Sequence, residues 1–505
     1  MHPFGVLSLL PALAAIVLAF RYRNVVLALT LAAWLAATMV EGWNPIAGAI
    51  HLVDPLILDA VADRDHMKVT LFSLFVGATV GILSKGGGTR ALVEFVIRFA
   101  RTRRSGMVAS WLAGLTIFFD DYANCLIIGS SMQPLSDRLK ISREKLAYIV
   151  DSTAAPIASL ALVSTWVGYE VGLVGDGLVA AGQTMDPYAF FVEGVPYRFY
   201  SLFTIAFVGL IAFTGRDFGP MVQAEQAAAR AEPDPDQATE QDLPASRLWL
   251  AVLPIASLIG VAAWDLWAQG TAASEPGAAL FEILGNADGY DAMLRASVAS
   301  VCLAIVIAVG QRALGAKEAF DAAVGGMSAL FDALIVLFLA WALGAGMGEL
   351  DAAGYLVSVL EGSLSAALLP TLVFLVAALT AFATGTSFGT MGILMPMVVP
   401  LTFAVAPDSM PIAFAAVGAV LSGACWGDHC SPISDTTVLS SLGTGCDHVA
   451  HVRTQLPYAF ATGIISVVAG TLPVGLGLPW PVCLLLGLTA CVLTVRFLGR
   501  DPLAA

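Results

Sequence analysis

Residues 423–441 read Gly423-Ala-Cys-Trp-Gly-Asp-His-Cys-Ser-Pro-Ile-Ser-Asp-Thr-Thr-Val-Leu-Ser-Ser441, a polar stretch that lies between long apolar runs. It contains two aspartates, a histidine, a proline and six hydroxyl side chains. A helix that crosses a bilayer should be apolar for about twenty residues, because hydrocarbon cannot satisfy polar groups. Pro432 also removes a backbone donor and clashes with the preceding turn. We therefore expect an apolar helix to enter this stretch and to break within 428–435.

A break in a membrane helix frees backbone carbonyls and amides next to polar side chains, and such breaks often carry transport sites. The alternative is a kinked helix whose serines bond to their own turns. That alternative leaves two buried aspartates unexplained, although ionisable residues are costly inside a membrane and usually functional. The candidate ligands of this stretch are Asp428, His429, Ser431, Ser434, Asp435 and Thr436.

The composition excludes a soluble protein. Over 505 residues, 58% are hydrophobic and only 12% are charged, with a mean hydropathy of +0.83, which is typical of a polytopic helical membrane protein. The net charge of −14 can be traced to particular loops and does not by itself indicate a partner. We expect the lipid bilayer as partner, no nucleic acid and no cofactor. The seven cysteines lie in or near apolar segments, which predicts free thiols.

The basic residues follow the positive-inside pattern, in which cytoplasmic loops are enriched in Lys and Arg. Arg21 and Arg23 follow the first apolar run, so we expect the N-terminus outside. Arg496 and Arg500 follow the last run, so we expect the C-terminus inside. The expected location is the cytoplasmic membrane of a bacterium or archaeon. Residues 167–196 contain acidic residues but no Lys or Arg, which predicts an outer loop.

A first unit covers residues 69–166. Two apolar runs flank the polar segment Asp120-Asp-Tyr-Ala-Asn124, with basic residues at both ends of the pair. Neither run is long enough to span a membrane, so we expect a re-entrant hairpin with its tip at 120–124. The next helix contains polar residues before Pro156, and we expect it to break at 151–156. The candidate ligands here are Asp120, Asp121, Asn124, Asp151, Ser152 and Thr153.

A second unit covers residues 323–441 and has the same order of elements. Its spanning segment carries Asp332 well inside an apolar run, and its hairpin tip is Thr384-Gly-Thr-Ser387. The loop charges place the first hairpin on the cytoplasmic side and the second on the outer side. Two similar units of opposite orientation predict alternating access, with a site where they meet. This tip adds Thr384, Thr386 and Ser387 to the candidate ligands.

The remaining segments complete the predicted organisation. The sequence predicts an all-α polytopic membrane protein with two inverted-topology repeats, each with a re-entrant hairpin and a broken helix. The other segments are expected to be N-terminal transmembrane helices in 1–68, a connecting helix and an acidic cytoplasmic linker in 167–247, scaffold-type helices in 248–322 and C-terminal helices in 442–505.

Three stretches resemble the NhaC family of sodium/proton antiporters, in the ion transporter superfamily. They are Trp426-Gly-Asp-His-Cys-Ser-Pro-Ile-Ser-Asp-Thr-Thr437, Phe118-Phe-Asp-Asp-Tyr-Ala-Asn124 and Asp151-Ser-Thr-Ala-Ala-Pro-Ile157. The resemblance covers most of the chain from Val69 to Tyr458. It implies a scaffold domain that forms a homodimer and a transport domain of hairpins and broken helices that moves like an elevator. The family also contains members that carry amino acids or exchange carboxylates.

Sodium prefers oxygen ligands, and the two tips and two breaks supply carboxylates, hydroxyls and freed carbonyls. We expect each hairpin tip to pair with the broken helix of its own unit. A carboxylate binds either sodium or a proton, so competition between them couples the two fluxes. We expect sodium at Asp120, Asn124, Asp151, Asp428 and Asp435. The candidates for the proton-linked group are Asp428, Asp151, Asp121, His429 and Asp332.

Two other functions were weighed against sodium/proton exchange. The first is sodium-coupled transport of a small organic solute such as an amino acid or carboxylate, although the candidate site contains no arginine, which argues against a dianion. The second is an intramembrane enzyme. The chain lacks His-Glu-x-x-His, and Gly385-Thr-Ser-Phe-Gly389 matches Gly-x-Ser-x-Gly only at a membrane hairpin tip, without the required strand. We therefore expect a transporter and not an enzyme.

Overall fold

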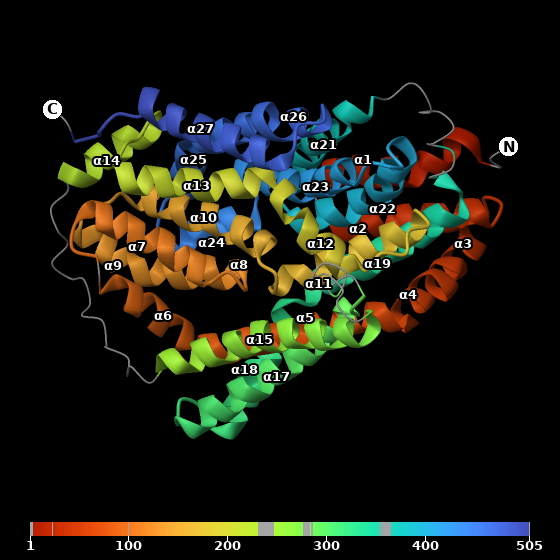
Figure 1. Ribbon diagram of the computed structural model, residues 1–505, viewed down its shortest axis with the longest axis horizontal. Helices are drawn as coiled ribbons and strands as arrows, with labels where there is room; N and C mark the ends of the chain where they lie inside the picture. Colours follow the sequence, from red (N-terminus) through yellow and green to blue (C-terminus); the bar gives the residue numbers. More distant parts are fainter. Residues whose placement is uncertain are drawn as a thin grey trace.

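Helices make up the fold, as the sequence predicts. The computed structural model describes residues 4–22, 24–98, 100–230, 247–275, 286–352 and 365–503, together with Ile283 and Tyr355. Within these residues there is no β-strand, and a single bridge of extended backbone pairs Asp217 with Arg500. Most helices run roughly along the long axis of the molecule (Figure 1).

Ten helical segments of the described chain are long and apolar enough to cross a membrane, and two bent helix pairs raise the number to as many as twelve. The chain is therefore a multi-pass membrane protein, and the predicted fold class is confirmed. The ten segments are Pro45–Ala62, Arg64–Lys85, Arg247–Ala273, Gly289–Gly310, Phe331–Glu349, Ala366–Thr384, Ser387–Val405, Met410–Cys430, His448–Gly475 and Trp480–Phe497. The bent pairs are Arg143–Leu160 with Thr165–Ala180, and Pro187–Tyr197 with Phe199–Thr214.

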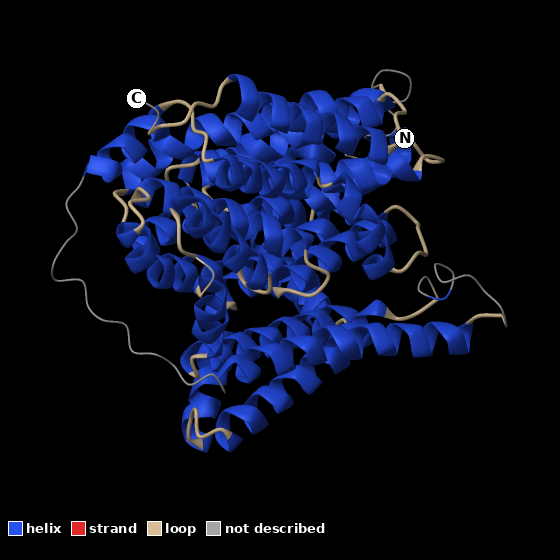
Figure 2. Ribbon diagram, turned by 60° about the vertical axis from the view of Figure 1, so that its left-hand side comes forward, coloured by secondary structure: helices blue, strands red, loops and turns tan. Residues whose placement is uncertain are grey.

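Four helices form a separate layer, which lies below the other helices in Figures 1 and 2. They are α5 (Arg64–Lys85), α15 (Arg247–Ala273), α17 (Gly289–Gly310) and α18 (Ala316–Ala329). Glycines bring α5 and α18 together, since a Cβ on Gly326 would lie 2.0 Å from the carbonyl oxygen of Gly77. Small residues allow such close approach of membrane helices. The layer contains the predicted scaffold-type helices and, in addition, α5 of the first unit.

The other helices lie on one side of this four-helix layer, above it in Figure 2. Those outside the hairpins and breaks are η1 (Gly5–Leu9), α1 (Leu10–Tyr22), α2 (Val25–Val40), α3 (Pro45–His51), η2 (Leu52–Ile57), α4 (Leu58–Ala62), α6 (Gly88–Ile97), α12 (Pro187–Gly194), η4 (Val195–Tyr197), α13 (Phe199–Thr214), α14 (Pro220–Arg230), α19 (Phe331–Glu349), η5 (Ala366–Leu368), α25 (His448–Ile465), η6 (Ser466–Thr471), α26 (Leu472–Gly475) and α27 (Trp480–Phe497).

Two helical hairpins lie where the sequence predicts them. In the first, α7 (Arg103–Thr116) turns through 117–120 into α8 (Asp121–Ala123), the π-helical turn η3 (Asn124–Ile128) and α9 (Gly129–Arg138). Its turn therefore begins just before the predicted tip. In the second, α21 (Leu369–Thr384) turns at 385–386 into α22 (Ser387–Val405). Gly385 makes this turn in the left-handed region, at φ 72°, which glycine adopts without strain.

One of the two predicted helix breaks lies elsewhere. α23 (Met410–Cys430) ends and α24 (Asp435–Thr444) begins within the predicted range 428–435. The break predicted at 151–156 is wrong, because α10 (Arg143–Leu160) continues through it and the chain breaks at 161–164 before α11 (Thr165–Ala180). A proline removes only one helical hydrogen bond, and Pro156 stays inside α10. The helix ends instead where Ala161 becomes extended and Ser164 caps α11.

Two further expectations are corrected by the fold. Residues 167–196 are not a loop, because most of them lie in α11 and α12, and Glu170 is buried there against Arg198. Asp332 does not lie well inside a span, because α18 ends at Ala329 and Asp332 lies exposed in the first turn of α19. Of the predicted linker, residues 231–246 lie outside the described residues.

The glycine contact between α5 and α18 predicts that alanine at two neighbouring positions of α18 has different effects on stability. Gly326→Ala should lower the free energy of unfolding by about 1–3 kcal/mol, because the new Cβ meets the Gly77 carbonyl. Gly325→Ala is the matched control, since its Cβ would meet nothing within 4 Å. Thermal unfolding of the purified variants measures both effects, and equal midpoints would contradict this packing.

Candidate functional site

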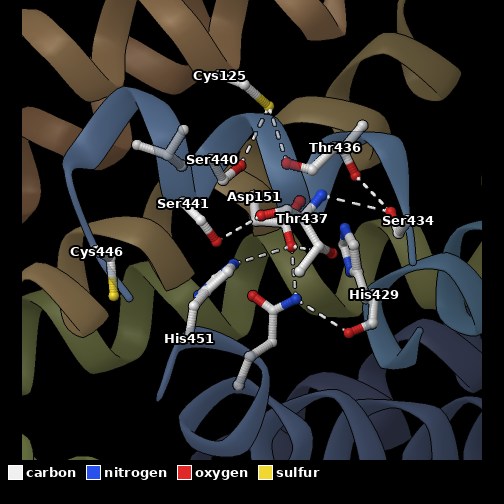
Figure 3. Close-up of polar contacts among 12 residues, drawn as sticks. Cys125, Asp151, His429, Ser434, Thr436, Thr437, Ser440, Ser441, Cys446 and His451 are labelled. Atoms are coloured by element: carbon white, nitrogen blue, oxygen red, sulfur yellow. Dashed lines mark hydrogen bonds and ion pairs between the residues drawn. The ribbon is translucent and has the colours of Figure 1, made fainter. Parts of the chain in front are cut away.

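The fully buried carboxylate of Asp151 lies at the centre of the polar contacts in Figure 3. Its Oδ2 accepts a hydrogen bond from Thr437 Oγ1 at 2.9 Å and one from Gln455 Nε2 at 2.6 Å. His451 Nε2 lies 3.4 Å from the same oxygen. These partners come from α24 and α25, so Asp151 joins the first unit to the broken helix of the second. Its Oδ1 is buried and has no hydrogen-bond partner among the residues that the structure describes.

Two of these partners were missed in the sequence. The C-terminal helices were expected within 442–505 without site residues, but α25 begins at His448, where the side chain of Asp447 accepts from the Ala450 amide, and it contributes to the site. His451 and Gln455 are therefore four residues apart on one helical face. The N-cap Asp447, followed by His451 and Gln455 four residues apart, was the sequence pattern that could have indicated these two partners. Thr437 belongs to the quoted polar stretch but was not among the candidate ligands.

Asp428 is a second buried carboxylate, located in the last turn of α23. Thr436 Oγ1 donates to its Oδ2 at 3.1 Å, and the Ser434 hydroxyl lies 3.3 Å from that of Thr436. Within the described ranges its Oδ1 has no hydrogen-bond partner. Asp428 interacts electrostatically with Asp151 and Asp435. The break between α23 and α24 thus brings three of the predicted aspartates into one region.

His429 lies beside this region but uses its ring elsewhere. Its Nδ1 is 3.0 Å from the Tyr200 hydroxyl, and its backbone carbonyl accepts from Gln455 Nε2 at 3.0 Å. The ring Nε2 is buried and has no partner. Gln455 therefore bridges Asp151 of α10 and the end of α23, and Tyr200 is a further contact that the sequence did not indicate.

Asn124 holds the first hairpin on α10. Its Nδ2 donates to the carbonyls of Gly114, Ile117 and Thr153 at 2.9, 3.1 and 3.1 Å. Gly114 makes this close approach possible, because a Cβ there would lie 2.1 Å from the Thr153 hydroxyl. The Thr153 hydroxyl itself donates to Ile149 in its own helix. Asn124 Oδ1 is buried without a partner.

The rest of the first tip faces both helix breaks. Asp120 Oδ1 accepts from the Ala123 amide at 2.6 Å, and the Phe119 carbonyl accepts from Thr165, the first residue of α11. Tyr122 donates to the exposed Asp435 at 3.1 Å. Asp121 is buried between Asp120 and this tyrosine.

α24 packs on the π-helical turn η3. A Cβ on Gly129 or on Gly443 would lie within 3 Å of backbone across this contact. In the same contact, Ser440 Oγ donates to Cys125 Sγ at 3.2 Å (Figure 3). Ser152 is buried next to Asp151 in α10.

The second tip contacts the α23–α24 break mainly through backbone. Ser431 Oγ donates to the Phe382 carbonyl at 2.8 Å, and a Cβ on Gly385 would lie 2.5 Å from the Ile433 carbonyl. The Thr384 and Thr386 hydroxyls bond within their own turns. Ser387 Oγ is buried and has no hydrogen-bond partner in the described chain.

The predicted sodium ligands therefore form neighbouring groups. Asp151, Asp428 and Asp435 lie around α24, whereas Asp120 and Asn124 belong to the first tip. Asp332, a candidate only for the proton-linked group, lies exposed on α19. Among the described residues, no three His, Cys, Asp or Glu side chains are placed to hold one metal ion. An ion here would rely mainly on hydroxyl and carbonyl oxygens added to one or two carboxylates.

Comparisons with known proteins match this chain to transporters. The family model described as "Na+/H+ antiporter family" matches residues 157–472. An uncharacterized protein of Haemophilus influenzae is 32% identical over 478 residues, which is 92% of this chain and 91% of that protein. A Bacillus subtilis protein named malate-2H(+)/Na(+)-lactate antiporter is 32% identical over 160 residues, which is 31% of this chain and 32% of that protein.

The fold is similar to that of a solved transporter. The YdaH transporter of Alcanivorax borkumensis superposes with a TM-score of 0.59 over 86% of this chain and 90% of that chain, at 16% sequence identity. At this identity the likeness concerns the fold alone.

The Asn124 contacts predict a stability effect at the first hairpin. Asn124→Ala removes the donors to three carbonyls and should cost about 1–3 kcal/mol of the free energy of unfolding. Ser130→Ala is the control, because that exposed hydroxyl donates to Leu126 in its own helix. Thermal unfolding of both purified variants measures the difference, and an Asn124→Ala midpoint equal to wild type would contradict the contact.

Proposed function

Because the chain belongs to the Na+/H+ antiporter family, we propose that this membrane transporter exchanges sodium for protons by alternating access between the two sides of the membrane. The family match confirms the resemblance found in the sequence motifs. The observation that carries the proposal is the contact around Asp151. There, a buried carboxylate at the junction of α10, α24 and α25 lies beside a second buried carboxylate, Asp428.

The two carboxylates have different roles in this proposal. Asp151 has hydrogen bonds from Thr437 and Gln455 with His451 close by, and donors of this kind hold a carboxylate as an anion. Asp428 accepts from the Thr436 hydroxyl, with the Ser434 hydroxyl nearby, and its Oδ1 has no hydrogen-bond partner among the described residues. Asp428 therefore exchanges a proton for sodium, while Asp151 supplies the fixed negative charge. Asp121, His429 and Asp332 become secondary candidates for the proton-linked group.

Sodium would enter along the exposed side of the break between α23 and α24. Asp435 is exposed and is contacted by the half-buried Tyr122, and Asp428 interacts with both Asp435 and Asp151. This order of carboxylates leads from the exposed surface to the buried site. The hydroxyls of Ser434 and Thr436 and the unpaired oxygen of Asp428 would take the place of water around the ion.

The layer of α5, α15, α17 and α18 would serve as the scaffold, and the hairpins and broken helices would move against it. This layer exposes large apolar side chains, which suit contact with lipid and with a second copy of the chain, so we include a homodimer in the proposal. The exposed side chains are Trp249, Leu253, Ile259, Trp264, Trp267, Val298 and Val306.

A second candidate is exchange of a small carboxylate together with sodium and protons. It is favoured by the 160-residue match to the protein named malate-2H(+)/Na(+)-lactate antiporter. The same aspartates would serve the cations in both cases.

Ion flux in sealed liposomes tests the main proposal. Wild-type protein, with a pH-sensitive dye inside and no organic solute, should move protons when sodium is added outside. Asp428→Asn should abolish this movement, because an amide cannot exchange a proton for a cation. Asp321→Asn, which changes an exposed carboxylate of α18, is the control and should exchange like wild type. Undiminished exchange by Asp428→Asn would exclude its proposed role.

The bond between Gln455 and Asp151 predicts a shift in pH dependence. Gln455→Leu removes a donor that holds Asp151 as an anion, so Asp151 should take up a proton, and the site should lose its fixed charge, at a higher pH than in the wild type. The acid limb of the exchange profile should move to higher pH by about one unit, the equivalent of one charge-assisted hydrogen bond. Thr454→Val is the control, since that hydroxyl donates only to carbonyls of its own helix. An unchanged profile for Gln455→Leu would count against Asp151 as the fixed anion.

A further inference from the structure

A buried arginine lies outside the ion site described above. Arg198 is 1% exposed and lies at the 49° bend between η4 and α13. Its Nη1 donates to Glu170 Oε2 at 3.0 Å, and Glu170, on α11, is fully buried. The guanidinium lies 4.1 Å from the centre of the Phe191 ring. The sequence predicts no arginine in the candidate site, and Arg198 follows directly after the predicted outer loop 167–196.

This ion pair is incomplete. Arginine and carboxylate commonly pair through two parallel hydrogen bonds, but only one is present here. Arg198 Nε and Glu170 Oε1 are both buried, and neither has a hydrogen-bond partner within the part of the chain that the structure describes. Leaving such groups unpaired is costly, so the guanidinium retains a free donor for another acceptor.

The start of α13 connects this pair to the ion site. Tyr200, two residues after Arg198, reaches His429. Next to them, the hydroxyls of Ser159 and Ser201 lie 3.1 Å apart. A small molecule at Arg198 would thus lie two residues along the chain from Tyr200, which contacts His429 of the proposed ion site.

We propose that Arg198 binds the carboxylate of a small monocarboxylic acid, which displaces Glu170, and that Glu170 then takes up one proton. The pair is neutral before binding. A carboxylate anion that enters together with a proton leaves the buried charge unchanged, whereas a bare anion would add an uncompensated charge. One guanidinium neutralises one carboxylate, so a dicarboxylate would keep a second charge unpaired. Transport of the acid rests on the proposed exchange function, but its binding does not.

Binding to purified protein tests this site without transport. The probes are acetate, L-lactate and succinate, with neutral lactamide as the control ligand. Acetate or lactate should raise the thermal unfolding midpoint of the wild type and should remove about one proton per bound acid from a weakly buffered dye solution. Lactamide should do neither, and succinate should bind more weakly than the monocarboxylates.

Variants separate the roles of the two residues. Arg198→Lys keeps the charge but loses the planar fork, so affinity for the acid should fall at least about tenfold. Glu170→Gln should bind the acid without proton uptake. Glu94→Gln, which changes a partly exposed residue of α6, should behave as wild type in both measurements. If Arg198→Lys does not fold, proton uptake by wild type and Glu170→Gln decides the question.

The proposal is overturned if no monocarboxylate binds the wild type, if Arg198→Lys binds as tightly, or if binding takes up no proton. Asp428→Asn distinguishes this result from the ion exchange. It should lose sodium-driven proton movement in liposomes and keep proton uptake on binding lactate. If Arg198→Lys loses only the proton uptake on binding lactate and retains sodium-driven exchange, the result still supports the proposed site.

Discussion

The carboxylate of Asp151 has no access to water, so its charge has to be matched by donors that the protein supplies. Thr437 and Gln455 bond to it from two different helices, and His451 lies nearby. An ionisable group without such partners is expensive in a membrane. This requirement ties α10 of the first unit to α24 and α25, and it places the break after α23 beside a second carboxylate, Asp428.

Close packing of backbone makes that arrangement possible. Membrane helices gain little from the hydrophobic effect when they associate, so small residues at their contacts matter. Gly114 lets the first hairpin approach Thr153, and Gly129 and Gly443 bring η3 onto α24. A Cβ on Gly427 would lie 2.0 Å from the Ala378 carbonyl, so α23 packs equally closely on the second hairpin. The buried polar groups and the glycines next to them thus form one structural unit.

Much of the fold follows from local sequence. The break after Cys430 and the turn at Gly385 depend on polar residues, proline and glycine within short segments, and both lie inside the predicted ranges. The break near Pro156 was misplaced, because a proline alone does not end a helix that its neighbours support. The acidic segment with Glu170 was taken for a loop, because its partner Arg198 follows 28 residues later and loop charge was the only guide.

The sequence by itself determined a polytopic helical membrane protein, its family and its two polar hairpin tips, and it marked Asp151 and Asp428 as candidate ligands. These follow from hydropathy, charge and motif, which are properties of neighbouring residues. Only the tertiary structure decided which groups meet: Gln455 with Asp151, Tyr122 with Asp435, and Arg198 with Glu170. Such pairs form between helices far apart in the chain, and their distances depend on how closely the helices pack, which no local pattern records.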